Sequence, residues 1–182
     1  MSVDQVPVKD LDKLPEDLRP EKLTTITKQN MTAFFSRHSK LSNHYPCKFT
    51  HNGVSYSSVE QCLMHNKAML FGDHQTATAI LKCTDPADAK FLGRKVQNYN
   101  HDAWRKNRDH MMMSAVEAKF TQNKVLTEFL KNTGHNILIE ANPHDKYWGI
   151  GQPLHDANIW KQDLWNGHNK LGYTLMETRA KL

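Results

Sequence analysis

The chain has 182 residues, three cysteines and a formal charge of +5 at pH 7, which suits one domain with a sizeable core. No apolar run reaches the length of a membrane span and the N-terminus has no hydrophobic signal region, so we expect a soluble protein, cytoplasmic or otherwise intracellular. The odd number of cysteines, without paired spacing, favours reduced thiols over disulfides or metal ligands.

The positive charge is unevenly distributed along the chain. Residues 1–22 hold four basic and six acidic residues, whereas the remainder holds twenty basic and thirteen acidic ones. A basic body favours an anionic ligand such as a phosphate or a nucleic acid, although plain solubility has the same signature. The eleven histidines form no HExxH pattern and none lies near a CxxC, so we predict no metal site and no cofactor.

In chain order, residues 1–29 come first and contain three prolines, alternating charges and few large apolar groups. This composition predicts an N-terminal extension that is partly disordered or draped over the domain. The domain itself is expected to span residues 30–182, with Phe34 and Phe35 beginning its core. Next, an Asn-Gly pair inside residues 47–56 supplies the positive φ of a β-hairpin turn.

The hairpin leads into a predicted helix that carries a carboxylate and an amine on one stripe. Ser57 and Glu60 have the spacing of a capping box, so the helix should begin just before Glu60. Glu60 and Lys67 are seven residues apart, which at about 100° per residue makes them nearly eclipse, with roughly 10 Å of rise between them. A sugar-sized substrate could touch both side chains.

Two interpretations of this pair are open. Most Glu and Lys side chains are solvated, so the pair alone is typical of an exposed helix face. Against that, the neighbouring positions form an apolar stripe made of Val59, Cys62, Leu63 and Leu70. Charged groups beside a buried face favour a functional role.

Four more helices, a short strand and a last helix complete the predicted fold. The four helices are expected at 74–83, 86–93, 102–120 and 125–132, the strand at 137–139 and the last helix at 171–179. Asp85 is the expected N-cap of the second of these helices, with Pro86 at its first position. The balance is that of a helix-rich, compact α+β domain with a small hairpin and too few strands for a doubly wound parallel sheet.

The long helix at 102–120 places aromatic and cationic side chains on one stripe. Met111 and Ala115 are typical of a core face. Trp104, Arg108 and Lys119 either snorkel at the edge of that core or form a stacking surface with phosphate clamps. The residues alone leave both interpretations open.

Two loops hold further polar candidates. In the segment 143–151, Gly149 and Gly151 would let backbone amides approach a ligand, and Asp145 is close to Trp148, although a tight turn that buries the indole has the same pattern. In the segment 41–46, Asn43 is a candidate to bind a base or ribose edge, or to cap a turn.

Ordered motifs run from about Phe34 to the C-terminus, whereas the proline-rich start is not covered. They are Ser36, Leu41 to Pro46, Tyr56 to Gln61, Lys67-Ala68, Ala89 to Arg94, Trp104, Ala118 to Asn123, Leu130 to Gly134, Tyr147 to Gly151, Asn169 to Gly172 and Leu175-Met176. In this order they resemble the NADAR family, the YbiA-like N-glycosidases. His44 departs from the family pattern, which more often has Phe at this position.

The resemblance implies a compact, helix-rich α+β domain that hydrolyses the N-glycosidic bond between a ribose and a base. It also implies a catalytic glutamate at Glu60, a reactive lysine at Lys67, pocket aromatics at Trp104 and Trp148, and an acidic catalytic group at Asp145. The residues expected to bind the substrate are Ser42, Asn43, Arg94, Trp104, Arg108, Lys119, Gln122, Trp148, Gly149 and Gly151.

These residue types fit the chemistry. Breaking a ribose C–N bond develops positive charge on the sugar and negative charge on the leaving nitrogen, so Glu60 can serve as acid or base. Lys67 adds a covalent route, because a neutral amine captures the opened sugar as a Schiff base. Desolvation and the like charge of Arg94 or Lys119 would lower the pKa of the Lys67 amine.

The sequence is compatible with four candidate functions. The resemblance implies removal of ADP-ribose from ADP-ribosylated guanine, in a nucleotide or nucleic acid, or cleavage of small phosphoribosylated intermediates of riboflavin synthesis. A non-catalytic module that binds ADP-ribose or NAD is disfavoured because it has no use for both Glu60 and Lys67. A plain nucleic-acid-binding module is disfavoured because the sequence has no helix-turn-helix, zinc-finger or RNP-type motif. No membrane partner is expected, and the sequence does not indicate an oligomeric state.

Overall fold

Helices provide most of the regular structure in the computed structural model, which describes residues 24–182. The helices are α1 (Val59–Leu70), α2 (His74–Leu81), α3 (Pro86–Gly93), α4 (His101–Gln122), α5 (Lys124–Lys131) and α6 (Lys170–Lys181), with short 3-10 turns at Ala157–Trp160 and Gln162–Leu164. Each predicted helix is present within a few residues of its expected ends. The expected Asp85 N-cap is also confirmed, since its side chain accepts a hydrogen bond from Ala87 N.

Five short strands form two sheets. The strands are β1 (Thr25–Lys28), β2 (Met31–Phe34), β3 (Phe49–His51), β4 (Val54–Tyr56) and β5 (Ile137–Glu140). The central β2 pairs antiparallel with β1 and parallel with β5, while β3 and β4 form the predicted hairpin. These elements confirm the α+β class. Because β1 lies in the sheet, residues 25–28 of the expected extension belong to the folded unit; residues 1–23 of that extension lie outside the described residues.

The start of α1 differs by one residue from the predicted capping box. Ser58 is the N-cap, and its hydroxyl accepts a hydrogen bond from Gln61 N at 3.1 Å. The Gln61 side chain reaches back and accepts from Ser57 N at 2.8 Å. Glutamine at the third helical position therefore fills the role expected of Glu60, which leaves the Glu60 carboxyl group free of capping.

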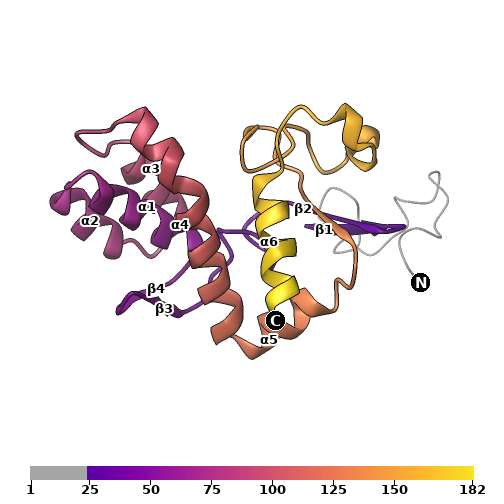
Figure 1. Cartoon of the computed structure of the whole chain (residues 1–182), viewed down its shortest axis with the longest axis horizontal. Coiled ribbons are helices and arrows are strands. Elements are labelled where there is room, and N and C mark those ends of the chain that lie inside the picture. The colour runs from indigo at the N-terminus through magenta and orange to yellow at the C-terminus, as the bar shows by residue number, and fades with distance from the viewer. Residues whose placement is uncertain (1–23) are drawn as a thin grey trace.

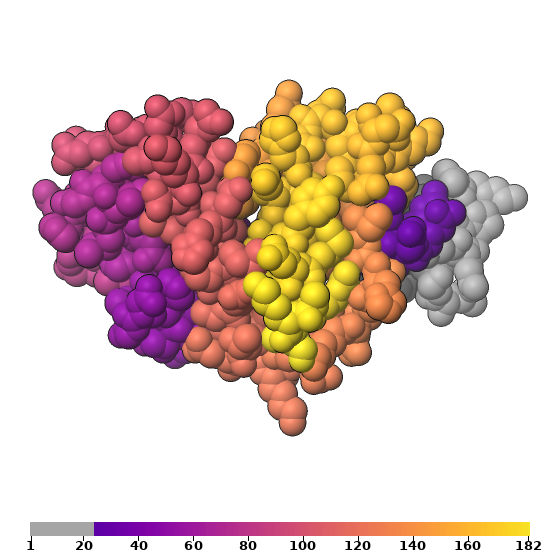
Figure 2. Space-filling model, in the orientation of Figure 1, coloured from indigo at the N-terminus to yellow at the C-terminus, as the bar shows by residue number. Residues whose placement is uncertain are grey.

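Two halves of the molecule meet across α4 and α6 (Figure 1). Helices α1 to α3 and the hairpin lie on one side and the three-stranded sheet on the other, while α4 and α6 run next to each other between them (Figure 2). Phe34 and Leu138 belong to the larger apolar core with the helices, whereas Ala33 and Ile139 pack in a second, smaller one. Alternation along a strand places Glu140 on the same sheet face as Leu138, towards the helices.

The three cysteines, at positions 47, 62 and 83, are free thiols, as predicted. Within residues 24–182 no helix combines the length and the apolar composition needed to cross a membrane.

Candidate active site

Glu60 and Lys67 face one cavity of about 160 Å³ between α1, α3, α4 and the loop that follows β5. The residues lining this cavity are Glu60, Leu63, Met64, Lys67, Lys90, Arg94, Trp104, Asp145 and Trp148. Six of them were predicted site residues from four separate segments. The fold thus brings together the proposed acid, the proposed nucleophile, two indoles and two cations.

The Glu60 carboxyl group is buried at the second position of α1, with 5% of the residue exposed. The Asn43 carbonyl accepts a hydrogen bond from Glu60 N at 3.1 Å, so the predicted Asn43 loop fixes the start of the helix. Burial raises the pKa of Glu60, and Lys90 opposes that rise. A raised pKa favours the protonated form of a carboxyl group, which is the form that can donate a proton.

His44 lies beside Glu60, with its Nε2 atom 3.6 Å from a carboxyl oxygen. Burial and the positive charges of Lys90 and Arg37 lower the pKa of His44 to about 4. The imidazole is therefore neutral at pH 7, and the contact is polar rather than an ion pair. His44 is therefore a polar, uncharged neighbour of Glu60.

The Lys67 amine is held in a semi-apolar setting. Its Nζ atom donates to the Gly93 carbonyl at 2.8 Å and lies 4.8 Å and 5.3 Å from the ring centroids of Tyr99 and Trp104. Desolvation lowers the pKa of Lys67, with Glu60 opposing and Arg94 adding to the effect. The lowered pKa increases the share of neutral, nucleophilic amine.

Gly93 makes this arrangement possible. A Cβ atom at this position would lie 2.1 Å from the Met64 sulfur, so any larger residue would push α3 away from α1. The close approach puts the Gly93 carbonyl within reach of Lys67.

The loop after β5 supplies Asp145 and Trp148. One carboxyl oxygen of Asp145 accepts hydrogen bonds from Tyr147 N and Trp148 N, both at 2.8 Å, which holds the turn and positions the indole. Gly149 is needed for packing, because a Cβ there would lie 2.8 Å from the Glu140 carbonyl. Gly151 adopts a positive φ of 69°. The two glycines shape the loop and do not line the cavity.

A narrower compartment of about 40 Å³ adjoins the cavity and shares Glu60, Lys90, Asp145 and Trp148 with it. Its other lining residues are Ser42, Asn43, His44, Glu140, Asn142 and Leu171. The predicted pair Ser42 and Asn43 thus reaches the site through this compartment. Asn43 Nδ2 itself points to the sulfur of Met112 at 3.3 Å.

Besides the two glycines, three predicted binding residues lie away from both hollows. Lys119 is 1% exposed and donates to the carbonyls of Lys40 and Ser42 at 2.7 and 2.8 Å. Burial lowers the pKa of Lys119 to about 8. Its position supports the loop that carries Asn43 and so acts on Glu60 indirectly.

The side chains of Arg108 and Gln122 also contact other parts of the protein and do not line the candidate site. The Arg108 guanidinium carbon lies 3.3 Å from the ring centroid of Tyr147, next to Trp148. The Gln122 side chain donates to and accepts from the backbone of Thr50, at 2.7 and 2.8 Å, and so ties the hairpin to α4.

The sequence did not indicate Lys90, Glu140 or Asn142 as site residues. Lys90 lines both hollows, and Glu140 and Asn142 line the narrow compartment. The one available signal was a glutamate at the end of an apolar strand, where a charged side chain is costly unless the site uses it.

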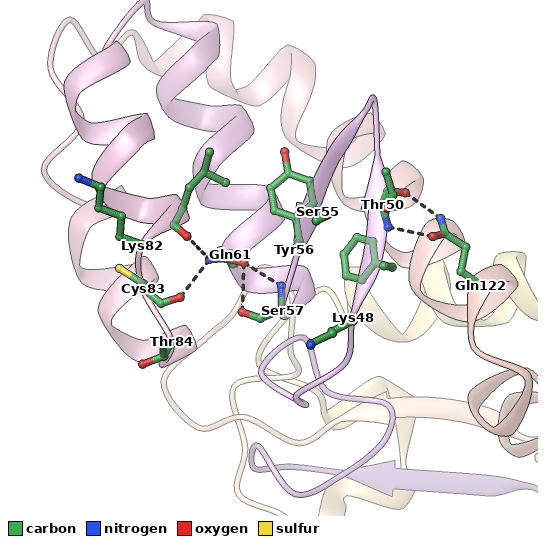
Figure 3. A pocket seen from close by; sticks show the side chains of 12 residues that line it. Lys48, Thr50, Ser55, Tyr56, Ser57, Gln61, Lys82, Cys83, Thr84 and Gln122 are labelled. Carbon is green, nitrogen blue, oxygen red and sulfur yellow. Dashed lines mark hydrogen bonds between the residues drawn. The ribbon is translucent and has the colours of Figure 1, made fainter.

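A larger groove of about 700 Å³ lies between the hairpin, the start of α1 and the α2–α3 loop (Figure 3). Gln61 crosses it and donates to the carbonyls of Ile80, Leu81 and Cys83 at 3.0 to 3.3 Å. Gln122 bonds to Thr50 at its other side. The polar groups that cross this groove are bonded to the protein's own backbone.

No group of three or more His, Cys, Asp or Glu side chains able to hold a metal ion occurs between residues 24 and 182. The cavity's chemistry is that of carboxyl groups, amines and aromatic rings.

Comparison with known proteins matches the chain to one family. The sequence model of the NADAR domain matches residues 29–182. The chain is 38% identical over 128 residues to an N-glycosidase of Acanthamoeba polyphaga mimivirus, which covers 70% of this chain and 75% of that protein. It is 32% identical over 145 residues to a riboflavin biosynthesis protein of Vibrio vulnificus, covering 80% of this chain and 36% of that longer protein.

The fold also matches a solved structure. The NMR structure of the E. coli protein YbiA superposes with a TM-score of 0.69 at 24% identity, covering 89% of this chain and 90% of YbiA. At that identity the likeness supports the fold.

Proposed function

The chain belongs to the NADAR family and is an N-glycosidase, and we propose that it removes ADP-ribose from ADP-ribosylated guanine. The observation that carries this proposal is the convergence of Glu60 and Lys67 on one cavity walled by Trp104 and Trp148. The indoles offer faces for stacking a base. The cations of the cavity rim complement a diphosphate.

Glu60 is the proton donor in this mechanism. Its raised pKa favours the protonated form, whose proton can pass to the leaving nitrogen as the ribose C–N bond breaks. Asp145 lies on the same cavity, where its carboxyl group can stabilise the positive charge that develops on the sugar.

Lys67 is the nucleophile. Its amine attacks the anomeric carbon, the base departs with the proton from Glu60, and the ribose ring opens to an imine that water then hydrolyses. The lowered pKa of Lys67 supports this role. Lys90 and Arg94 line the same cavity, and in this proposal their positive charges bind phosphate oxygens.

A second candidate substrate is a phosphoribosylaminopyrimidine of riboflavin synthesis. The similarity to the Vibrio vulnificus protein favours it, and the small cavity suits a compact substrate.

One comparison separates the two candidate substrates. Purified protein is incubated separately with ADP-ribosylated guanine DNA and with a ribosylaminouracil phosphate, and release of the free sugar is followed. We expect release from the first substrate. Release from the second alone would replace the proposed substrate, and binding of ADP-ribose without release from either would replace the proposed activity.

A further inference from the structure

The Glu140 side chain is buried at the end of β5 with an unmet hydrogen-bonding group. The residue is 7% exposed, and its Oε2 atom has no hydrogen-bond partner among the described residues. Its backbone is fixed, because Glu140 N donates to Asn169 Oδ1 at 3.0 Å and its carbonyl accepts from Ile150 N at 2.9 Å. A buried carboxyl oxygen without a partner is costly unless the site uses it.

Glu140 and Glu60 both line the narrow compartment, although they come from opposite halves of the molecule. The volume of the narrow compartment is about 40 Å³. Since one water molecule needs about 10–15 Å³ of cavity volume, the compartment can hold a few water molecules but not a sugar. The lining is polar on most sides, with Ser42, Asn43 and Asn142 among its members. The compartment therefore has the size and polarity to bind water, and it adjoins the cavity proposed to bind the substrate.

The charges facing this compartment are three carboxyl groups and one amine, from Glu60, Glu140, Asp145 and Lys90, beside the neutral His44. Burial raises the pKa of Glu140 to about 8, with Asp145 and Glu60 adding to the rise and Lys90 opposing it. Burial also raises the pKa of Glu60. Two like groups that share a site hold protons as a pair.

We propose that Glu140 is a further catalytic residue, which binds the hydrolytic water in the narrow compartment and accepts a proton from it. This inference rests on the proposed N-glycosidase function. In the reactive state Glu60 carries a proton and Glu140 is a carboxylate that faces the water. Because burial raises the pKa of Glu140 to about 8, this carboxylate form increases as the pH rises towards that value.

The proton transfers balance over one turnover. Glu60 gives its proton to the leaving base as the C–N bond breaks. The water oxygen then bonds to the anomeric carbon, of the imine or of the sugar itself, and one water proton passes to Glu140. In the imine route the other water proton moves to the Lys67 nitrogen as the C–N bond to Lys67 breaks. Transfer of the proton from Glu140 to Glu60 restores the starting state.

The test compares Glu140→Gln with Glu128→Gln on substrate cleaved by the wild type. Glu128 is an exposed residue of α5, remote from the cavity, so its variant is matched in chemistry and charge. We expect Glu140→Gln to lower kcat by about 100-fold or more with little change in KM, while the control stays within about twofold. The wild type should lose activity at low pH, where both Glu60 and Glu140 are protonated. The activity of Glu140→Gln should not show this decrease at low pH.

The outcomes are distinguishable. A Glu140→Gln variant with wild-type kcat, or one that changes only KM, overturns the role of Glu140 and leaves the proposed function standing. A wild type that cleaves neither substrate overturns both. If Glu140→Gln does not fold, Glu140→Asp decides, because it should keep the decrease at low pH while kcat falls about tenfold; an unchanged kcat overturns the inference.

Discussion

Glu60 and Gln61 are neighbours in α1, yet they point into different hollows with opposite properties. Gln61 crosses the 700 Å³ groove and uses both ends of its amide in hydrogen bonds to Ser57 and to three backbone carbonyls. Glu60 faces the 160 Å³ cavity with a buried carboxyl group, and the imidazole of His44 beside it is neutral. Among the described residues the Gln61 amide is fully hydrogen-bonded, whereas the Glu60 carboxyl group has no hydrogen bond from the protein.

The contrast favours the smaller hollow as the candidate catalytic site. A groove whose polar groups are bonded to backbone resembles the interior of any loop-rich region. A small cavity that buries the Glu60 carboxyl group and desolvates the Lys67 amine, with the pKa of the first raised and that of the second lowered, is typical of a functional site. Substitutions at Glu60 and at Gln61 should therefore have opposite effects on activity and stability.

The largest expected effect follows Glu60→Gln. The change keeps shape and removes proton transfer, so kcat should fall by more than about 100-fold. The variant should melt no lower than the wild type, because burial disfavours the charged carboxylate that it removes. Sugar release and a thermal melt on the same preparation test both statements, and near-normal turnover would reduce Glu60 to a residue of the helix start.

Lys67→Arg should abolish covalent trapping. Borohydride added during turnover should reduce the imine on Lys67 to a stable adduct with the mass of protein plus reduced ADP-ribose. A guanidinium keeps the positive charge but is effectively never a neutral nucleophile, so the variant should give no adduct. If the wild type turns over without an adduct at Lys67, hydrolysis proceeds through Glu60 and an activated water.

Gln61→Leu should have the reverse phenotype of Glu60→Gln. It removes the hydrogen bonds that the Gln61 amide makes to the carbonyls of Ile80, Leu81 and Cys83 and the one that it accepts from the Ser57 backbone, which together cost about 1–3 kcal/mol of folding free energy. Activity per folded molecule should stay within a few-fold of wild type. Urea unfolding and kcat on the folded fraction measure the two effects; full stability with lost activity would reverse the roles assigned to the two hollows.

The local signals in the sequence predicted the helices and half of the site. Asp85 and Pro86 predict the start of α3. Any regular helix places Glu60 and Lys67, seven residues apart, on the same face of α1. The capping box was off by one residue because Ser57 and Ser58 are both suitable caps, and the choice depends on Gln61 as a partner.

What the sequence could not predict depends on distant segments. Strand β2 is short and pairs with β5 more than a hundred residues later, so Glu140 meets Glu60 only after the sheet and helices pack. Lys119 is the converse case. The helical periodicity predicts the face of α4 on which Lys119 lies, but not which segment packs over that face. In the structure the segment from Lys40 to Ser42 does so, and the carbonyls of Lys40 and Ser42 accept the hydrogen bonds of the Lys119 amine.

The smallest effect is expected from Lys48→Gln combined with Lys82→Gln. Both residues are exposed, line the groove and have no salt bridge among the described residues, so stability should change by less than about 0.5 kcal/mol. Cleavage of an ADP-ribosylated guanosine should stay within about twofold, because neither lysine lines the cavity. The same assay on ADP-ribosylated DNA at two salt concentrations sharpens the comparison, since a lysine that contacts phosphate weakens binding and lowers its salt dependence when neutralised. An unchanged KM on DNA keeps the groove structural, whereas a raised KM confined to DNA would make the larger hollow part of substrate recognition and break the contrast between the two.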